Sequence, residues 1–283
     1  MAAQIVDGKR ISEEIKAEVQ AEVAVLNAAG KFPCLAVVLV GDDAASAVYV
    51  ANKKKACEYT GVKSVSYELP AETEESTLLQ LIAELNADET IHGILVQLPL
   101  PKHIDEEKIL LAIQPEKDVD CFHPYNVGLV SIGTGTLLPG TPAGIIELLK
   151  RSGIEIAGKH CVVIGRSNIV GKPVASLLLR ENGTVTICHS RTADLAEITK
   201  QADILVAAVG KPKFVTTDMV KAGAVVIDVG IHRLGGKKLC GDVAYDSCAE
   251  KAAFITPVPG GVGPMTIAMM VKNCVAAYRL QNK

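Results

Sequence analysis

The chain has 283 residues, enough for one large domain or two of ordinary size, and 49% hydrophobic residues are ample for extended cores. A net charge of -3 creates no basic field for nucleic acid or an anionic membrane, so a small-molecule partner is expected. No apolar run reaches the roughly 18 residues of a membrane span, and the N-terminus lacks a signal-peptide core. We therefore expect a cytoplasmic or organelle-matrix protein.

The cysteines exclude two further classes of protein. All eight are scattered singly, without a Cys-x-x-Cys pair or a histidine cluster at zinc spacing. We expect reduced, mostly buried thiols, with neither a disulfide framework nor a metal site.

The first half of the chain alternates between helical and strand patterns. Apolar residues at spacings of three and four predict a helix from Asp7 to Gly30. The run CLAVVLV at 34–40 is typical of a strand buried on both faces of a parallel sheet. Further patterns predict a helix from residue 46 to about Gly61, a strand at 64–70, a helix starting near 72–76 and a strand at 91–101. This alternation is typical of an α/β layer fold.

Residues 115–141 interrupt the pattern, because they are rich in Gly and Pro and have no sustained period. A stretch of this length is usually a functional loop or a linker, and we place a domain boundary near its end. A helix over 142–153 follows, with Pro142 in its first turn.

The second half resumes the alternation. Four short apolar strands are predicted, at 159–165, 184–190, 202–210 and 224–230. Their spacing indicates a doubly wound nucleotide-binding sheet. An apolar helix from Met265 to Leu280 is expected to pack against the first domain. We thus predict two α/β domains flanking a cleft: residues 1–140 with 264–283 form one, and residues 141–263 form a Rossmann-like doubly wound parallel sheet.

The predicted helix after the first buried strand carries a candidate site. Helical periodicity places Ser46, Tyr49 and Lys53 on one stripe, so a hydroxyl, an aromatic ring and an amine share a face. The alternative is that Lys53 belongs to a solvated run of three consecutive lysines.

A second candidate site follows the strand at 159–165. Gly165 and Gly171 surround a strand-to-helix turn suited to a pyrophosphate, but Ser167 and Val170 occupy the second and third glycine positions of G-x-G-x-x-G. An ordinary strand-to-helix turn is the alternative.

The preferred dinucleotide of such a site is indicated by its arginines. Ser190 and Arg191 stand where an NAD-binding fold carries an acidic residue, and Arg166 lies in the first loop, which favours the 2′-phosphate of NADP. For Arg191, a solvated loop position is the alternative.

Taken together, the motifs are similar to those of one family. The sequence closely resembles the bifunctional methylenetetrahydrofolate dehydrogenase/methenyltetrahydrofolate cyclohydrolase (FolD-type) family. Seven blocks carry the resemblance, in order along the chain: YVANKKKA, GILVQLPLP, KDVDCFHPYNVG, PGTPAGI, VIGRSNIVGKPVA, VIDVGI and TPVPGGVGPMT.

The resemblance implies oxidation of 5,10-methylenetetrahydrofolate by NADP⁺ and hydrolysis of the methenyl product to 10-formyltetrahydrofolate by a homodimer. The catalytic residues that it implies are Lys53, its hydrogen-bonding neighbour Gln97, and Asp120, which holds the pterin. The folate site would comprise Gln97 and Asp120 with Ser46, Tyr49, Pro259, Gly260 and Gly261. The NADP site would comprise Thr141, Gly165, Arg166, Ser167, Ser190, Arg191 and Ile231.

Alternatives stay open for some of these roles. Asp120 is either a pterin ligand or a loop cap, with Asp118 the nearest candidate for confusion, and Gln97 could simply satisfy backbone groups. The six histidines are dispersed, and His123 is expected to be structural. Rival functions are a dehydrogenase without cyclohydrolase activity and a catalytically silent nucleotide-binding regulatory protein.

Overall fold

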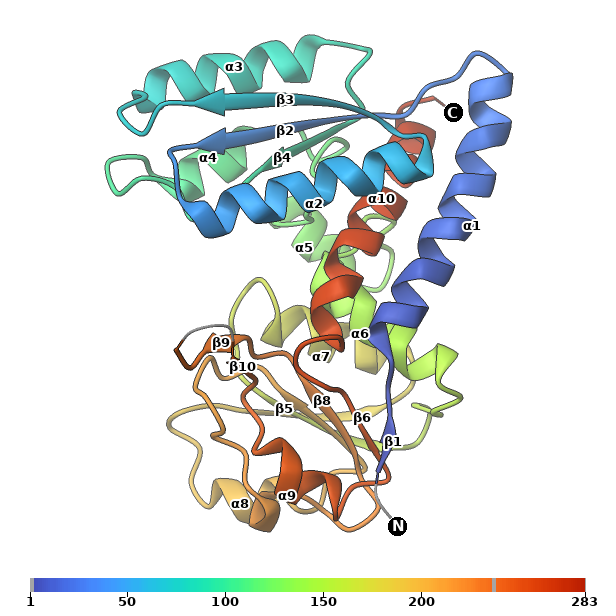
Figure 1. Ribbon diagram of the computed structural model, residues 1–283, viewed down its shortest axis with the longest axis vertical. Helices are drawn as coiled ribbons and strands as arrows, with labels where there is room; N and C mark the ends of the chain where they lie inside the picture. The colour runs from blue at the N-terminus through green and yellow to red at the C-terminus, as the bar shows by residue number, and fades with distance from the viewer. Residues whose placement is uncertain (1–2, 236–237, 283) are drawn as a thin grey trace. The chain divides into compact units, whose positions relative to one another are not determined.

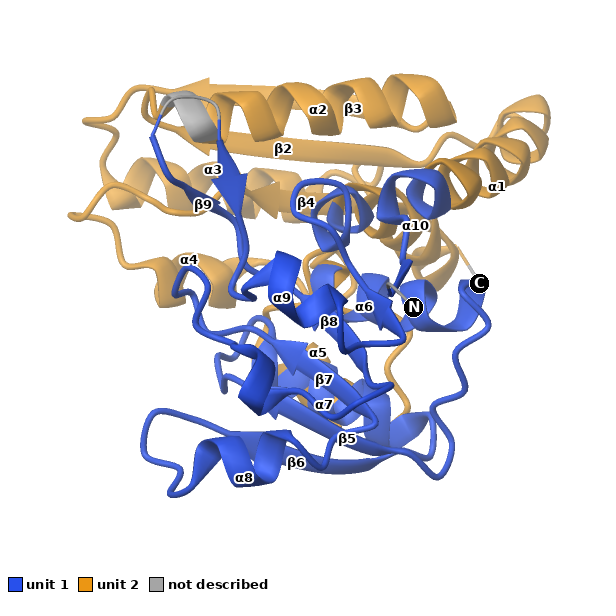
Figure 2. Cartoon of the chain, turned by 60° about the horizontal axis from the view of Figure 1, so that its bottom comes forward, with its two compact units in different colours: residues 1–12, 141–266 blue, residues 13–140, 267–283 orange. Residues whose placement is uncertain are grey.

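The structure is a computed structural model that describes residues 3–235 and 238–282. The chain divides into two compact units (Figure 2). Unit 1 comprises residues 1–12 and 141–266, and unit 2 comprises residues 13–140 and 267–283.

Unit 2 contains a three-stranded parallel sheet in the order β3-β2-β4. Its strands are β2 (Cys34–Val40), β3 (Lys63–Leu69) and β4 (Gly93–Val96). The helices are α1 (Gly8–Ala28, from residue 13 on), α2 (Ala44–Thr60), α3 (Glu75–Ala87), α4 (Glu106–Ala112), α5 (Pro124–Ser131) and the later part of α10 (Val262–Gln281). β2 and β4 are adjacent and parallel, so the polar segments that follow them lie at the same edge of the sheet, where the strand order reverses.

The core of unit 2 explains why β2 is apolar throughout. All seven of its residues are buried, and Figure 1 shows α2 and α3 on opposite sides of the three strands. On the α3 side, Leu78, Ile82 and Leu85 repeat with helical spacing and join alternate residues of β2 and β4 in one hydrophobic cluster. A strand covered on both faces has no solvated face that would need polar residues.

Unit 1 contains a six-stranded parallel sheet in the order β1-β11-β8-β7-β5-β6. Its strands are β1 (Gln4–Ile5), β5 (His160–Ile164), β6 (Thr184–Cys188), β7 (Ile204–Ala207), β8 (Val225–Asp228) and β11 (Phe254–Ile255). An antiparallel pair, β9 (His232–Arg233) and β10 (Leu239–Cys240), stands apart from this sheet. The helices are α6 (Gly140–Arg151), α7 (Gly171–Arg180), α8 (Leu195–Thr199), a 3-10 helix (Thr217–Met219), α9 (Tyr245–Ala249) and the start of α10.

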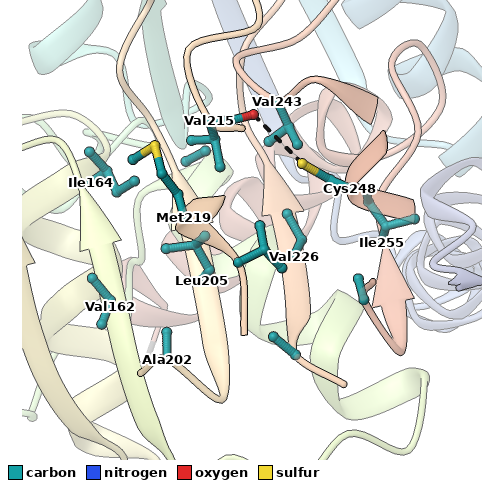
Figure 3. Close-up of a cluster of buried hydrophobic side chains, with 14 of the residues drawn as sticks. Val162, Ile164, Ala202, Leu205, Val215, Met219, Val226, Val243, Cys248 and Ile255 are labelled. Carbon is teal, nitrogen blue, oxygen red and sulfur yellow. Dashed lines mark hydrogen bonds between the residues drawn. The ribbon is translucent and has the colours of Figure 1, made fainter. Parts of the chain in front are cut away.

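This order confirms the predicted Rossmann-like doubly wound sheet, because β5 lies between β6 and β7 and the strand order reverses there. Figure 3 shows one face of the sheet: Val162, Leu205, Val226 and Ile255, from four strands, belong to one hydrophobic cluster with Met219 of the 3-10 helix. The reversal leaves room for a ligand at the carboxyl ends of β5 and β7.

Some elements differ from the expectations drawn from the sequence. The aperiodic stretch at 115–141 contains α5, which is too short to show a helical period and begins at Pro124 beyond the capping residue His123. The strand β1 was not predicted, and it pairs in parallel with β11. Residues 1–12 therefore belong to unit 1 rather than with 13–140, and the second boundary falls after Thr266 rather than after residue 263. The assignment of folate and cofactor roles to the two units stays a prediction.

The cysteines are free thiols, of which only Cys240 is partly exposed. Within residues 3–235 and 238–282, no group of His, Cys, Asp and Glu side chains could hold a metal ion. No helix in the same described ranges is long and apolar enough to cross a bilayer.

Candidate active site

The lysine-bearing helix α2 is delimited at both ends. The Asp43 carboxylate accepts a hydrogen bond from the backbone amide of Ser46 (2.7 Å), and Gly61 ends the helix at a φ of 76°. On the predicted stripe, Ser46 and Lys53 are buried, whereas Tyr49 is 45% exposed and free to pack on a ligand.

The three consecutive lysines have different environments. Lys53 is 8% exposed, whereas Lys54 is partly exposed and pairs with Glu68 (2.9 Å) and Lys55 is exposed. The solvated interpretation therefore fits Lys55 and not Lys53. Helical rotation turns successive residues about 100° apart and accounts for the difference.

Gln97 holds the amine of Lys53. The residue directly follows β4, and its backbone amide continues the sheet by donating to Val38 O (2.8 Å). Its side-chain Oε1 accepts a hydrogen bond from Lys53 Nζ (2.9 Å), while Nε2 donates to Leu98 O (2.7 Å). Gln97 thus satisfies a backbone carbonyl and also orients the amine, so both interpretations of this residue apply.

Asp118 and Asp120 have different hydrogen-bond environments. Asp118 forms a parallel bridge with Ile94 beside β4, which extends the edge of the sheet. Its carboxylate accepts hydrogen bonds that order the start of α5, from Phe122 N (3.2 Å), His123 N (2.8 Å) and Asn126 Nδ2 (2.9 Å). Asp120 is partly buried, and no hydrogen bond from a described residue reaches its carboxylate. The carboxylate of Asp120 is thus available to a ligand.

Burial and charge change the proton affinities of Lys53 and Asp120. Burial lowers the pKa of the Lys53 amine below its usual 10.5, opposed by the negative charge of Asp120. Burial, reinforced by Asp118, raises the pKa of Asp120 to about 6, against the opposing effect of Lys53. The pair can therefore supply an amine that accepts a proton and a carboxylate that accepts hydrogen bonds above about pH 6.

Lys117 is a supporting residue that the sequence reasoning missed. Its Nζ donates to three carbonyls at the end of α3, those of Leu85 (3.0 Å), Asn86 (2.9 Å) and Asp88 (2.7 Å). Such carbonyls have no partner within a helix. Its own carbonyl accepts from Ile94 N (2.7 Å), so Lys117 anchors the segment that carries Asp120. A charged residue directly before the two aspartates was the only signal in the sequence.

The glycine loop of unit 1 brings backbone segments into close approach. A Cβ on Gly165, whose φ is +127°, would lie 2.2 Å from Ala208 O, and a Cβ on Gly171 would lie 2.3 Å from Gly165 O. Ser167 Oγ accepts hydrogen bonds from the amides of Val170 (3.2 Å) and Gly171 (3.3 Å) at the start of α7. Ser167, which replaces the second glycine of the usual motif, thus orders the turn. The loop suits a pyrophosphate at the N-terminus of α7.

The remaining predicted cofactor residues also belong to unit 1. Ser190 and Arg191 follow β6 and are exposed, as is Arg166 after β5. Ile231 follows β8 with 47% of its surface exposed, and Thr141 Oγ1 lies 2.8 Å from Thr266 Oγ1. Arg166, Ser190, Arg191 and Ile231 follow parallel strands, and such residues gather at the carboxyl edge of the sheet, where dinucleotides bind. Thr141 instead lies in α6.

Pro259, Gly260 and Gly261, predicted to line the folate site, lie in unit 1 rather than with Lys53, Gln97 and Asp120 in unit 2. Gly260 has a φ of +105°, and its carbonyl accepts from Lys9 N (3.0 Å). The loop is therefore tied to the start of α1, and its conformation requires glycine at this position.

Comparison with known proteins identifies the family of the chain. Residues 6–120 match the catalytic domain of tetrahydrofolate dehydrogenase/cyclohydrolase, and residues 139–282 match its NAD(P)-binding domain. The bifunctional protein FolD of Lachnoclostridium phytofermentans is 66% identical over 96% of this chain and 97% of its own length. That of Moorella thermoacetica is 62% identical over 99% of this chain and 100% of its own.

Two solved structures have the same fold over nearly the whole chain. The bifunctional enzyme FolD of Campylobacter jejuni superimposes with a TM-score of 0.96 at 48% identity, covering 99% of both chains. The Trypanosoma brucei methylenetetrahydrofolate dehydrogenase-cyclohydrolase, complexed with NADP cofactor and inhibitor, gives 0.94 at 41% identity, covering 100% of this chain and 99% of its own. The chain therefore belongs to the tetrahydrofolate dehydrogenase/cyclohydrolase family.

Proposed function

We propose that this protein oxidises 5,10-methylenetetrahydrofolate with NADP⁺ and hydrolyses the 5,10-methenyl product to 10-formyltetrahydrofolate. The observation that carries the proposal is the buried Lys53 amine held by Gln97 beside an unpaired Asp120 carboxylate. Membership of the family and the bifunctional relatives support it.

In the dehydrogenase step, positioning is the main task of the protein. Bound NADP⁺ supplies the hydride acceptor. Arg166, Ser190 and Arg191 would hold its 2′-phosphate, because guanidinium and hydroxyl donors suit that group. The remaining contacts would come from Thr141, Gly165, Ser167 and Ile231. Loss of hydride from the substrate carbon needs little acid or base help, because the adjacent nitrogens stabilise the cationic product.

The folate would be held from two sides. Asp120, ionised above about pH 6, would accept hydrogen bonds from the polar edge of the pterin. Tyr49, which is 45% exposed, would pack against the ring, with Ser46 beside it on the same stripe of α2. For Pro259, Gly260 and Gly261, in unit 1, the resemblance also supports a contact with the folate.

In the hydrolytic step, Lys53 would act as the base. Water attacks the methenyl carbon, a carbon–oxygen bond forms, and a water proton passes to the neutral Nζ. The hydroxyl of this adduct then loses its proton to solvent and becomes the formyl carbonyl as the bond from the carbon to N5 breaks. N5 takes up the proton that Nζ holds, so the formyl group stays on N10, the amine is neutral again and one proton is released overall. Gln97 orients the amine without a charge that would raise its pKa.

A spectral assay distinguishes the alternatives. Purified protein with methylenetetrahydrofolate is followed for methenyl absorbance and reduced cofactor, with NADP⁺ and NAD⁺ in parallel. We expect turnover that favours NADP⁺, and decay of separately supplied methenyl substrate. Oxidation without that decay would indicate a dehydrogenase alone, and the absence of both reactions would indicate a silent nucleotide-binding protein.

The setting of the activity is part of the same proposal. We infer a cytoplasmic homodimer that acts on a small molecule and binds neither nucleic acid nor membrane. The net charge of -3 supports the absence of a nucleic-acid partner. Light scattering of the purified protein tests the dimer, and a mass near 29.8 kDa, that of one chain, would contradict it.

A further inference from the structure

A fully buried carboxylate, that of Asp242, lies outside the residues assigned so far. Four hydrogen bonds reach it: from Val209 N (2.6 Å), Gly210 N (3.0 Å), Lys211 N (3.0 Å) and His232 Nε2 (2.7 Å). The three amides are consecutive in the loop after β7, and such an arrangement of N–H groups favours an anion. Asp242 therefore fixes the path of this loop from within the protein.

His232 connects the same carboxylate to a second loop. It begins β9 directly after Ile231, in the segment that follows β8, and it pairs with Cys240 of β10. Since β7 and β8 are adjacent parallel strands, both loops lie at the carboxyl edge of the sheet. Asp242 and His232 thus form a bridge between two loops at the edge where a dinucleotide binds.

The surroundings leave the bridge little freedom. Asp228, at the end of β8, accepts hydrogen bonds from the amides of Gly230 (3.0 Å), Asp242 (2.8 Å) and Val243 (3.0 Å). A Cβ on Gly230 would lie 2.3 Å from Asp242 Oδ1, and a Cβ on Gly241 would lie 1.9 Å from Asp228 Oδ2. The backbone is therefore packed directly against both carboxylates, which fixes the position of Asp242. A hydrogen bond to this fixed carboxylate in turn restrains His232 and the segment after β8.

We propose that His232 is a positioning residue for NADP⁺ binding: through Asp242 it holds Ile231 and the loop at residues 209–211 in the arrangement that receives the cofactor. The inference rests on the proposed function, which assigns NADP⁺ to this edge. Without the imidazole donor, the Asp242 carboxylate keeps its hydrogen bonds from three backbone amides, but the segment after β8 loses its side-chain hydrogen bond to this carboxylate.

Three variants test the proposal. In His232→Leu the donor is lost, whereas in His232→Gln an amide N–H replaces Nε2–H at a similar reach. Lys221→Met is the matched control, because it breaks an ion pair with Asp203 (2.6 Å) at the opposite, amino end of β7. Thermal unfolding of each variant is recorded first, so that only folded protein is compared.

The Kd for NADP⁺ is then measured by calorimetry on protein without cofactor, and KM and kcat are measured for the dehydrogenase step. We expect His232→Leu to raise Kd and KM at least fivefold with a smaller change in kcat. His232→Gln should recover most of the affinity, and Lys221→Met should bind as the wild type does.

Three outcomes would overturn the inference: an unchanged Kd in His232→Leu, equal losses in His232→Leu and His232→Gln, or an equal loss in Lys221→Met. Failure of the proposed function is a separate result, since wild-type protein would then neither bind NADP⁺ nor oxidise the folate.

Discussion

Replacing Lys53 by methionine removes the proposed base and little else. Methionine has a similar length and suits a site that is 8% exposed, so the packing of α2 should be kept. Gln97 Oε1 loses the hydrogen bond from Lys53 Nζ (2.9 Å), which lowers the free energy of unfolding by about 1 kcal/mol. The variant is therefore expected to fold and to bind both ligands.

The expected effect on hydrolysis follows from the role of the amine. A positioned general base contributes about 10²- to 10⁴-fold, which corresponds to about 3–5 kcal/mol of transition-state stabilisation. The Lys53→Met variant should lose that factor in hydrolysis and keep part of its hydride transfer. In the wild type, hydrolysis should speed up as pH rises through the lowered pKa of Lys53, because only the neutral amine accepts a proton.

The assay separates the two steps. Decay of preformed methenyl substrate measures hydrolysis, and reduction of NADP⁺ measures the dehydrogenase. Lys54→Met is the matched control, because Lys54 is the next residue of α2 and its ion pair with Glu68 is exposed to solvent. Such pairs contribute about 0–1 kcal/mol, so both activities should stay within about twofold of the wild type.

A second variant distinguishes a base from a fixed positive charge. Lys53→Arg keeps the charge, but a guanidinium does not lose its proton near neutral pH. We expect it to hydrolyse as slowly as Lys53→Met. Hydrolysis within tenfold of the wild type in Lys53→Met, or wild-type hydrolysis in Lys53→Arg, would refute the assignment.

Three further predictions concern neighbouring features. Asp120 has a pKa raised to about 6, so the carboxylate is protonated below that value and the KM for the folate should rise as the pH falls. In steady-state kinetics, Asp120→Asn should raise this KM about tenfold or more and abolish its pH dependence. Asp118→Ala removes three hydrogen bonds, so urea unfolding should show a loss of about 2–4 kcal/mol, and a loss under 1 kcal/mol would contradict its structural role. Ser167→Ala removes the hydrogen-bond acceptor at the start of α7, so the free energy of unfolding should fall by about 1 kcal/mol and the KM for NADP⁺ should rise. An unchanged KM would show that Ser167 has no role in cofactor binding.

Local patterns predicted the regular elements well. The strand at 34–40 is buried throughout, as its run of apolar residues indicated, and periodicity located α1, α2 and α3. The elements that were missed are short: β1, β9, β10 and β11 have two residues each, and α4, α5 and α9 have seven, eight and five. Such segments contain too few residues to establish a period, and their pairing partners are distant in the chain.

For the site, helical spacing placed Ser46, Tyr49 and Lys53 on one stripe, and the structure distinguishes Lys53 from its two neighbours by burial. The spacing alone did not distinguish Asp118 from Asp120. That difference depends on which carboxylate the amides at the start of α5 reach.

The sequence by itself determined the α/β class and the buried parallel strands, and it supplied the candidate site residues, because these depend on composition, periodicity and local motifs. Only the tertiary structure decided that Gln97 reaches Lys53, that Lys117 closes the end of α3 and that Asp242 joins the loops after β7 and β8. Each of these contacts joins residues about 10 to 45 positions apart, and their proximity is produced by the packing of strands and helices rather than by any local pattern.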